Sequence, residues 1–446
     1  MTASTVHVVH CIDTEGPLHE PLWATFQRLK EVFGIDLPPS SATLKQIQRQ
    51  ELDLGGREAE VAAIFSEHFL AYNDTWDKID LMHEEILSPE YRNRSADSFG
   101  NGWIYNWFCL DVVGYQYNLR RRDMGFHNVY DHYREILAAT GSTQDGVHFH
   151  HHPVSFTKAA HHYATHYFSH TPVIFEIFAR RIIERQWFPC ANRPGFNVTR
   201  PDSHWFMEQH IPFDIASQAT EEDYSRNLDL AEGRLGDWRR APLTWMPYHP
   251  DHDDYQIPGN CRRWIARCLS VGSRARLLTE NDVELAFQEA QQGKPVVLAF
   301  TNHDYRDMRP DIEQVQALLK AVSARYPNVP FKYCEARDAM RGALGLKPGL
   351  PLEFSVSIEN NRLHVKSNRP TFGPQPFLAL KTHDERFLHD NFDFQTPFRE
   401  WTYTFDEHSI PLSALETVGI GACDETGNAT VALFDSRTGI ISHWHH

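Results

Sequence analysis

Short apolar runs alternate with segments of helical spacing through the first three quarters of the chain. Val6 to Ile12 is rich in β-branched residues, and a second strand-like run covers residues 103–113. Between and after these runs, at 22–33 and 127–139, apolar residues recur every three or four positions. Buried strands give the first pattern and amphipathic helices the second. The alternation predicts an α/β domain.

A polar, largely helical segment interrupts this alternation at about residues 36–100. It follows a break at Leu37-Pro38-Pro39-Ser40 and has helical spacing at 58–72 and 76–87. Because proline ends a helix and the strand-like pattern resumes only after Gly100, we interpret the segment as a helical insertion that covers the barrel or sheet. The predicted first domain therefore spans residues 1–345 and contains this insertion.

The last hundred residues have a different pattern. A segment punctuated by glycine and proline at 344–352 reads as a linker. It is followed by short alternating runs at 353–358, 362–367, 377–381, 401–405, 417–422 and 430–434. Such runs predict a small β-sandwich domain at 350–446. Two roles remain open for it: a module that contacts glycan or forms an oligomer, and a structural support for the first domain.

Composition and charge restrict the class of protein. Apolar residues make up 41% of the 446 residues, and the formal net charge is −16. An acidic chain is unsuited to general binding of a phosphate backbone, so we expect no nucleic-acid partner. The N-terminus has no basic segment followed by an apolar stretch, and no transmembrane run is found, so we expect a cytoplasmic protein. The seven scattered cysteines predict reduced thiols.

The strongest chemical signal is Gly146-Val147-His148-Phe149-His150-His151-His152-Pro153, with four imidazoles in five positions. His148 and His152 are four apart, so one helical turn, or a tight loop entering a helix, would direct both rings to one point. Neutral imidazoles suit a divalent metal, with Zn²⁺ preferred and Co²⁺, Ni²⁺, Mn²⁺ or Fe²⁺ as alternatives. We interpret His150 and His151 as neighbours of the site. A His148-x-His150 pair would suit an amidohydrolase barrel, but there the pair ends the first strand, whereas here it comes some 135 residues after the first acid.

Other histidine pairs share the same spacing. His162, His166 and His170 are four residues apart within an aromatic-rich segment of helical pattern. We interpret them as packing or substrate-side residues, because aromatic stripes at helical spacing usually belong to a core.

Two carboxylates stand directly after the first predicted strand, where α/β folds place active-site residues. Asp13 and Glu15 are separated by Thr14. Two acids in this position could divide the work, one holding a metal and the other removing a proton from its water. Capping of a following helix is the structural alternative.

Together these segments resemble the NodB-like polysaccharide deacetylases, carbohydrate esterase family 4 in the broad sense, over roughly residues 5 to 340. The family has an acidic first motif, an H-x-x-x-H-P motif, an Arg-Pro motif and a late strand that ends in histidine. The matching segments occur in the family's order and are Ile12 to Pro17, His148 to Pro153, Asn192 to Phe196, and Val296 to His303.

The resemblance implies a distorted (β/α) barrel of about seven strands. It also implies a divalent metal held by Glu15, His148 and His152, with Asp13 as the base. The usual first motif has two adjacent aspartates, whereas this chain has D-x-E. That departure leaves the roles of Asp13 and Glu15 open to exchange.

Two further residues complete the expected mechanism. His303 ends the apolar strand from Val296 and is expected to protonate the leaving amine, with Asp304 or Asp307 close enough in sequence to raise its pKa. Arg193 is expected to keep the base ionised by charge pairing. Arg200 is its rival, but it precedes Pro201 in a pattern typical of a helix start.

The sequence thus predicts a metal-dependent hydrolase that removes an N-acyl group, acetyl or formyl, from an amino sugar of a cell-surface polysaccharide or its precursor. The expected partner is an N-acyl amino sugar or glycoconjugate. Two alternatives remain open: an amide or cyclic-imide hydrolase with a non-sugar substrate, and a glycan-binding relative that has lost catalysis.

Overall fold

The computed structural model describes residues 3–113, 125–153, 173–222 and 235–446. His162, His166 and His170 lie outside the described residues, so their predicted packing role stays a prediction. All seven cysteines are free thiols, as expected. Among the described helices, none has both the length and the apolar character needed to cross a bilayer.

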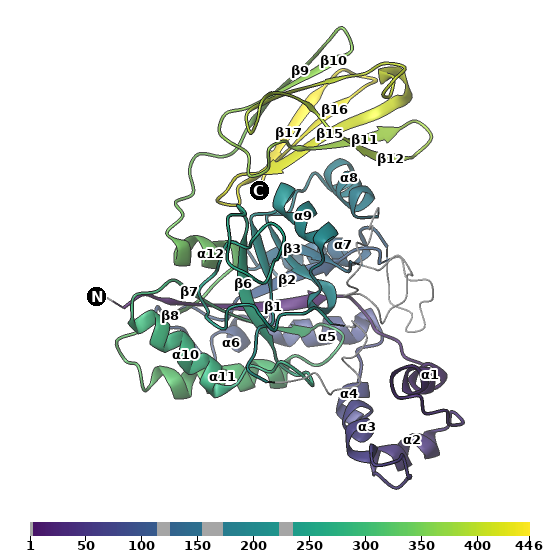
Figure 1. Ribbon diagram of the computed structural model, residues 1–446, viewed down its shortest axis with the longest axis vertical. Coiled ribbons are helices and arrows are strands. Elements are labelled where there is room, and N and C mark those ends of the chain that lie inside the picture. Colours follow the sequence, from purple (N-terminus) through teal and green to yellow (C-terminus); the bar gives the residue numbers. More distant parts are fainter. Residues whose placement is uncertain (1–2, 114–124, 154–172, 223–234) are drawn as a thin grey trace.

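Among the described residues, eight strands form one parallel sheet, and seven of them close into a barrel (Figure 1). The strands are β1 (Val6–Thr14), β2 (Tyr105–Leu110), β3 (Gly146–His151), β4 (Ala191–Pro194), β5 (Phe213–Ser217), β6 (Trp264–Ser270), β7 (Val296–His303) and β8 (Phe331–Tyr333). They follow one another from β2 to β7, and β1 closes the ring by pairing with both β7 and β2. β8 pairs with the start of β1, where β2 does not reach. The predicted α/β barrel is confirmed at this level.

Alternate residues of each barrel strand point into the barrel. In β1, Val9 and Cys11 belong to an enclosed apolar cluster, whereas Val8 and Ile12 pack outward in the cluster that includes the helices. This is the period of two that a strand imposes. The other strands contribute Phe108, Ala191, Phe213, Ile215, Ala266, Cys268, Val297 and Ala299 to the interior. Because side chains fill the interior, polar chemistry is confined to the ends of the barrel.

Helices follow most strands and cover the outside of the barrel (Figure 1). They are α7 (Asn128–Ala139), α8 (Val173–Arg185), α9 (Pro201–His210), α10 (Glu280–Gln291), α11 (Arg309–Ser323) and α12 (Ala336–Leu344). Their boundaries follow local sequence signals. At α10, the Thr279 side chain accepts a hydrogen bond from the Asp282 backbone, and the Asp282 side chain accepts one from the Thr279 backbone. This reciprocal capping fixes where the helix begins.

The insertion predicted at 36–100 divides into two parts. Its helices, with the one before it, are α1 (Leu22–Phe33), α2 (Ser41–Gln48), α3 (Glu58–Ile64), α4 (Glu67–Leu70), α5 (Trp76–Ile86) and α6 (Pro89–Arg92). The first four form an outer lobe with its own apolar cluster, which includes Phe26, Leu29 and Phe65 (Figure 1). α5 instead packs into the main core through Met82 and Ile86. The lobe therefore starts with α1, earlier than predicted.

Two antiparallel sheets form the C-terminal region. One contains β9 (Phe354–Glu359), β10 (Arg362–Ser367), β13 (Asp393–Thr396) and β14 (Glu400–Thr404), and the other contains β11 (Phe377–Thr382), β12 (Phe387–Asp390), β15 (Leu415–Cys423), β16 (Ala429–Asp435) and β17 (Ile441–His445). Leu363 and Trp401 of the first sheet share one apolar cluster with Leu380 and Val418 of the second. A common core between two sheets is the arrangement of a β-sandwich.

The second of these sheets packs against α8 of the barrel. The ring of Phe178 on α8 lies 5.4 Å from that of Phe377 on β11. Gly421 on β15 allows a close approach, because a Cβ at that position would lie 2.5 Å from Phe188 and 2.9 Å from Ile182. The barrel and the C-terminal region thus meet through an apolar contact.

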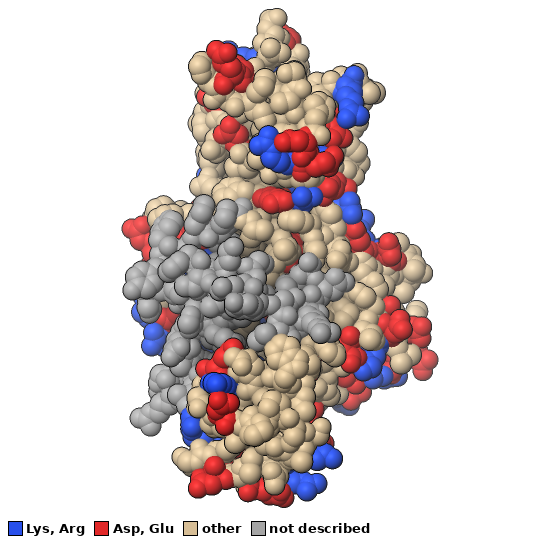
Figure 2. All heavy atoms as spheres, turned by 90° about the vertical axis from the view of Figure 1, so that its right-hand side faces the viewer, with Lys and Arg blue, Asp and Glu red and all other residues tan. Residues whose placement is uncertain are grey.

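The surface has no single sign of charge on the side that Figure 2 shows. Acidic and basic side chains are mixed over the visible described surface.

Candidate metal centre

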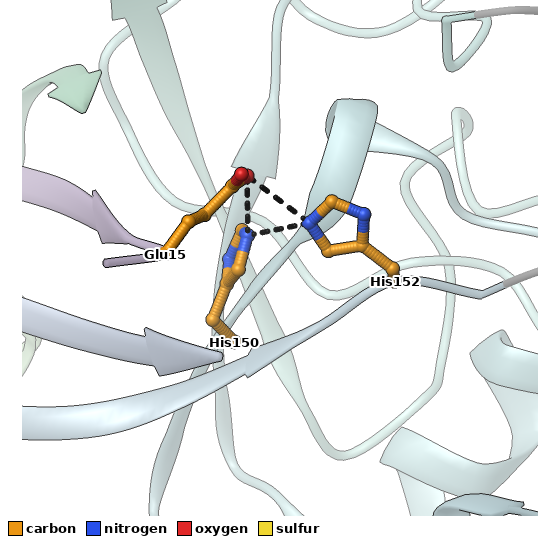
Figure 3. Close-up of side chains that lie close together, drawn as sticks. All are labelled: Glu15, His150 and His152. Carbon is orange, nitrogen blue, oxygen red and sulfur yellow. Dashed lines mark hydrogen bonds and ion pairs between the residues drawn. The ribbon is translucent and has the colours of Figure 1, made fainter. Parts of the chain in front are cut away.

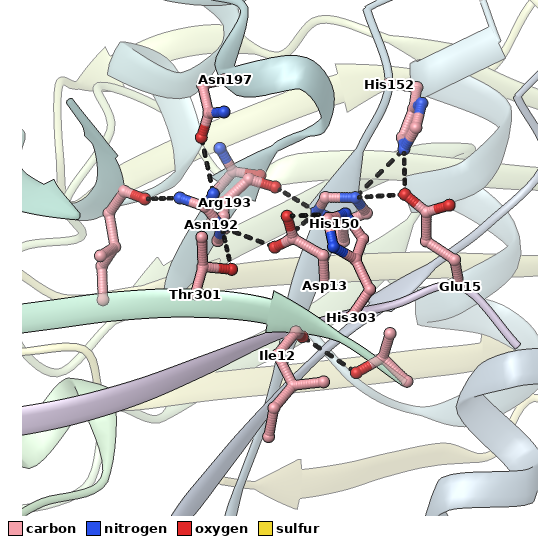
Figure 4. A network of polar contacts seen from close by, with 12 residues as sticks. Ile12, Asp13, Glu15, His150, His152, Asn192, Arg193, Asn197, Thr301 and His303 are labelled. Carbon is pink, nitrogen blue, oxygen red and sulfur yellow. Dashed lines mark hydrogen bonds and ion pairs between the residues drawn. The ribbon is translucent and has the colours of Figure 1, made fainter. Parts of the chain in front are cut away.

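Polar side chains gather at the carboxyl ends of the barrel strands. Asp13 on β1, His150 on β3, Arg193 on β4 and His303 on β7 continue the inward-facing columns (Figure 4). Asp13, His150 and Arg193 are at most 4% exposed. In such an environment charges interact much more strongly than in water. This is the end of an α/β barrel at which active sites are normally found.

Three of the buried groups converge on one point (Figure 3). The Nε2 atoms of His150 and His152 are 3.1 Å apart, and Glu15 Oε1 lies 3.7 Å from the first and 3.2 Å from the second. One ligand atom from each residue lies within 4.8 Å of the other two. Glu15 follows β1, and both histidines belong to β3 or its first residues beyond. The ends of β1 and β3, two strands on either side of β2, therefore supply the whole cluster.

The hydrogen bonding of His150 suits metal binding. Its Nδ1 donates to the backbone carbonyl of Arg193 at 2.7 Å, which leaves a lone pair on Nε2 in the neutral ring. Histidine ligands in proteins are commonly oriented in this way, by a hydrogen bond from the other ring nitrogen. Two imidazole nitrogens and one carboxylate oxygen are a donor set that fits Zn²⁺ or a related divalent ion and leaves a position for water. Glu15, His150 and His152 could therefore hold a metal.

His148, predicted as a ligand, lies at a different level of the barrel. Its Nε2 is 3.0 Å from Glu335 Oε1 and 3.2 Å from Asn106 Oδ1. Burial alone would raise the pKa of the Glu335 carboxyl, but pairing with His148 outweighs it and lowers that pKa to about 2. His148 is therefore half of a buried ion pair.

The difference from the predicted ligand set has a simple geometric cause. The H-x-x-x-H interpretation placed His148 and His152 on a helical turn or a tight loop, but His148 lies in a strand. Along a strand, residues four apart are separated by about 13 Å, whereas residues two apart are neighbours on one face. The structure therefore brings His150, and not His148, together with His152 and Glu15.

Asp13 stands beside this cluster and is paired with a buried arginine. Arg193 Nε donates to Asp13 Oδ1 at 2.5 Å, and its Nη2 donates to Asn197 at 2.6 Å (Figure 4). Burial would raise the pKa of the Asp13 carboxyl, but the neighbouring positive charge, that of Arg193 above all, holds it below its usual value. The same pairing raises the pKa of Arg193 against the effect of its own burial. Asp13 is thus kept ionised.

His303 lies on the opposite side of Asp13 from Arg193 and is the more accessible partner. Its Nε2 is 3.7 Å from Asp13 Oδ2, and its side chain is 28% exposed. The acids expected to raise its pKa are directed elsewhere: Asp304 accepts from the backbone of Glu15, and Asp307 pairs with an arginine on α11. The carboxylate that faces His303 at this distance is that of Asp13.

Arg200, the rival to Arg193, lies outside this network. Its guanidinium pairs with Asp202 at 3.0 Å and donates to the backbone carbonyl of Pro153. It precedes α9, as its sequence context predicts. Between the two arginines, Arg193 is therefore the one that contacts Asp13.

Two residues of the site have partners in the structure that the sequence did not predict. His150 was interpreted as a neighbour, although its even spacing from His152 would have pointed to one face if the segment had been assigned as a strand. Asp304 was considered only for its proximity to His303, because nothing local in the sequence shows that it bonds to the end of β1.

Comparison with protein-family models, curated proteins and solved structures gives no match to this chain. A functional assignment must therefore rest on the site itself.

Proposed function

We propose that the protein is a metal-dependent hydrolase that removes an N-acyl group, acetyl or formyl, from an amino sugar of a surface polysaccharide or its precursor. The observation that carries the proposal is the position of Asp13. This ionised acid lies beside the Glu15, His150 and His152 cluster and between Arg193 and His303. The proposed class is that of the NodB-like deacetylases, in a D-x-E form.

The residues have separable roles in this scheme. A divalent cation held by Glu15, His150 and His152 would polarise the acyl carbonyl and lower the pKa of a water ligand towards neutrality. Asp13 is placed to take a proton from the attacking water, because Arg193 keeps it ionised without blocking Oδ2. The division of labour between Asp13 and Glu15 follows from their partners, which are an arginine for one and two imidazoles for the other.

In this scheme His303 would complete the reaction. Cleavage of the C–N bond produces an amine that must be protonated before it leaves. His303 faces Asp13 and is partly accessible to a bound substrate. A proton passed from Asp13 to His303 would return the site to its starting state.

A panel of acyl compounds tests this proposal against its alternatives. The protein, reconstituted with Zn²⁺ or Co²⁺, would be incubated with N-acetyl and N-formyl amino sugars, simple N-acyl alkylamines and cyclic imides. Release of acetate or formate from the sugars, absent in Asp13→Asn, is the expected result. Hydrolysis of amides or imides alone would favour the non-sugar alternative. Binding of sugars without release would favour the non-catalytic one.

A further inference from the structure

The carboxylate of Asp304 holds the backbone from which Glu15 projects. Asp304 directly follows β7, and its two oxygens accept hydrogen bonds from the backbone N–H groups of Glu15 and Gly16, both at 2.9 Å. These are the first two residues after β1. A carboxylate that accepts two successive N–H groups fixes both the position and the direction of the chain at that point.

Asp304 is itself held from two other elements. The hydroxyl of Tyr133 on α7 donates to Asp304 Oδ2 at 2.9 Å, and the same hydroxyl lies 3.3 Å from Nε2 of His83 on α5. The Asn73 side chain donates to the backbone carbonyl of Asp304 at 3.0 Å. Side chain and main chain of Asp304 are therefore both anchored, and the carboxylate has little freedom to follow a shift of Glu15.

The turn beyond Glu15 is equally constrained. Gly16 has a φ of +71°, a conformation that other residues rarely adopt, and a Cβ there would lie 2.9 Å from the ring of Trp76 on α5. Burying a carboxylate is unfavourable unless its hydrogen bonds are satisfied. Asp304 is fully buried and meets this condition, because it accepts hydrogen bonds from the Glu15 and Gly16 N–H groups and from the Tyr133 hydroxyl. These bonds hold the backbone at Glu15 and Gly16 in place.

We propose that Asp304 is the positioning residue for the Glu15 ligand in the metal centre. It acts through the backbone: by fixing the N–H groups of Glu15 and Gly16, it sets the point from which the Glu15 carboxylate reaches His150 and His152. The inference rests on the metal centre of the proposed function, but it requires no particular substrate.

Metal affinity measures this effect directly. Co²⁺ would be titrated into the metal-free protein while its visible absorption spectrum is recorded, and affinity would be obtained by competition with a chelator. In Asp304→Asn an NH₂ group replaces one accepting oxygen, so one of the two backbone N–H groups loses its hydrogen bond. We therefore expect the affinity for Co²⁺ to fall by about 10 to 100-fold and the Co²⁺ spectrum to change. Tyr133→Phe, which keeps the ring and loses one donor, should show a smaller fall in the same direction.

Asp307→Asn provides the matched control. It makes the same chemical change three residues away, on an acid that pairs with Arg309, and should leave affinity and spectrum unchanged. Unfolding of the metal-free proteins would show whether a variant is folded, and Tyr133→Phe carries the test if Asp304→Asn is not. A folded Asp304→Asn with the wild-type affinity and spectrum would overturn the inference, as would a wild-type protein that binds no Co²⁺. Asp304-dependent Co²⁺ binding without release of any acyl group from sugars would support the inference and contradict the proposed function.

Discussion

The four histidines of residues 148–152 face different surroundings because a strand sends neighbours to opposite sides. His148 pairs with Glu335, while His150 and His152 face Glu15. His151 points away from the barrel interior, and burial holds its pKa well below the usual value, so it stays neutral. One short segment thus supplies two candidate metal ligands, the partner of Glu335 and a buried neutral ring.

Alanine substitutions should separate the first two of these roles. His150→Ala removes one of the three proposed ligands and should reduce metal content severely. His148→Ala should retain about one metal per chain but lower the free energy of unfolding by roughly 1–3 kcal/mol, because Glu335 loses one partner and keeps the Asp338 N–H and Arg337. Metal analysis and urea unfolding of both variants test this. Similar metal loss in the two variants would mean that the ligand set is wrong.

Asp13 and His303 should behave as catalytic residues that do not hold the metal. Asp13→Asn and His303→Gln should each lower turnover of an N-acyl amino sugar by roughly 10² to 10⁴-fold, since each removes one proton-transfer group. Metal content should stay near that of the wild type in both. Loss of metal from Asp13→Asn would instead assign Asp13 as a ligand and reopen the exchange of roles with Glu15.

Most residues of the candidate site could be predicted from the sequence, but one proposed ligand could not. Asp13, Glu15, His152, Arg193 and His303 meet in the structure because each lies at or just beyond the end of a strand. The strand-end position of Asp13, Glu15 and His303 was predicted from the sequence, whereas His152 and Arg193 were identified through the family motifs. The choice between His148 and His150 depended on whether the segment was strand or helix. The five consecutive histidine or phenylalanine positions at 148–152 give no clear period from which to decide.

At the scale of the elements, α8 is packed on two sides, against the barrel and against the C-terminal sheet. Phe178 contacts Phe149 of β3 on one side and Phe377 of β11 on the other. β15 can lie close to α8 because Gly419 and Gly421 have no side chains. The C-terminal sheet therefore covers an apolar helix face, which favours the structural role for this region. A role in oligomer formation stays a prediction.

Gly421→Ala tests the tightness of this boundary. The added methyl group would overlap Phe188 and Ile182, so we expect the free energy of unfolding to fall by roughly 1–3 kcal/mol. Ser355→Ala, on the exposed side of β9, should change it by less than about 0.5 kcal/mol. Urea unfolding followed by circular dichroism gives both values. Equal stability of the two variants would show that the boundary can adjust.

The predicted bounds of strands agree best with the structure where buried and exposed residues alternate along the strand, or where all of its residues are buried. The range predicted for β10, residues 362–367, is the range observed, and its burial alternates along the strand. β13 was missed because all four of its residues are exposed, and β8 because it has only three residues. Closure of the barrel by β1 joins residues far apart in sequence, which no local pattern records.

For the whole molecule, buried neutral histidines couple stability to pH. Burial, with a smaller effect of His389, lowers the pKa of His210 to about 3. The ring lies among aromatic side chains, including those of Phe206 and Phe377. Since an unfolded histidine has a pKa of about 6.5, the unfolded chain takes up a proton below that pH while the folded chain does not. Stability is therefore fully present above pH 6.5 and falls as the pH decreases towards 3.

His210→Phe should reduce this dependence. Between pH 6.5 and pH 5, the wild type should lose roughly 1.5 kcal/mol more of its free energy of unfolding than the variant, because the variant lacks this one proton uptake. Urea unfolding at several pH values gives the comparison. His408→Gln, at an exposed position, should keep the wild-type slope. A His210→Phe protein with that same slope would contradict the assignment of His210 as a neutral buried group.

The outer lobe of α1 to α4 is attached in a way that bears on how this chain can evolve. The chain enters and leaves the lobe at adjacent points, since the Leu18 backbone donates to the Asn73 carbonyl at 3.0 Å. The lobe also has its own apolar cluster, separate from the main core. A gene could therefore gain, lose or exchange this segment and keep the barrel. α5, whose Trp76 covers Gly16, has no such freedom, so we expect relatives to vary in length before Asn73 and to keep their spacing after it.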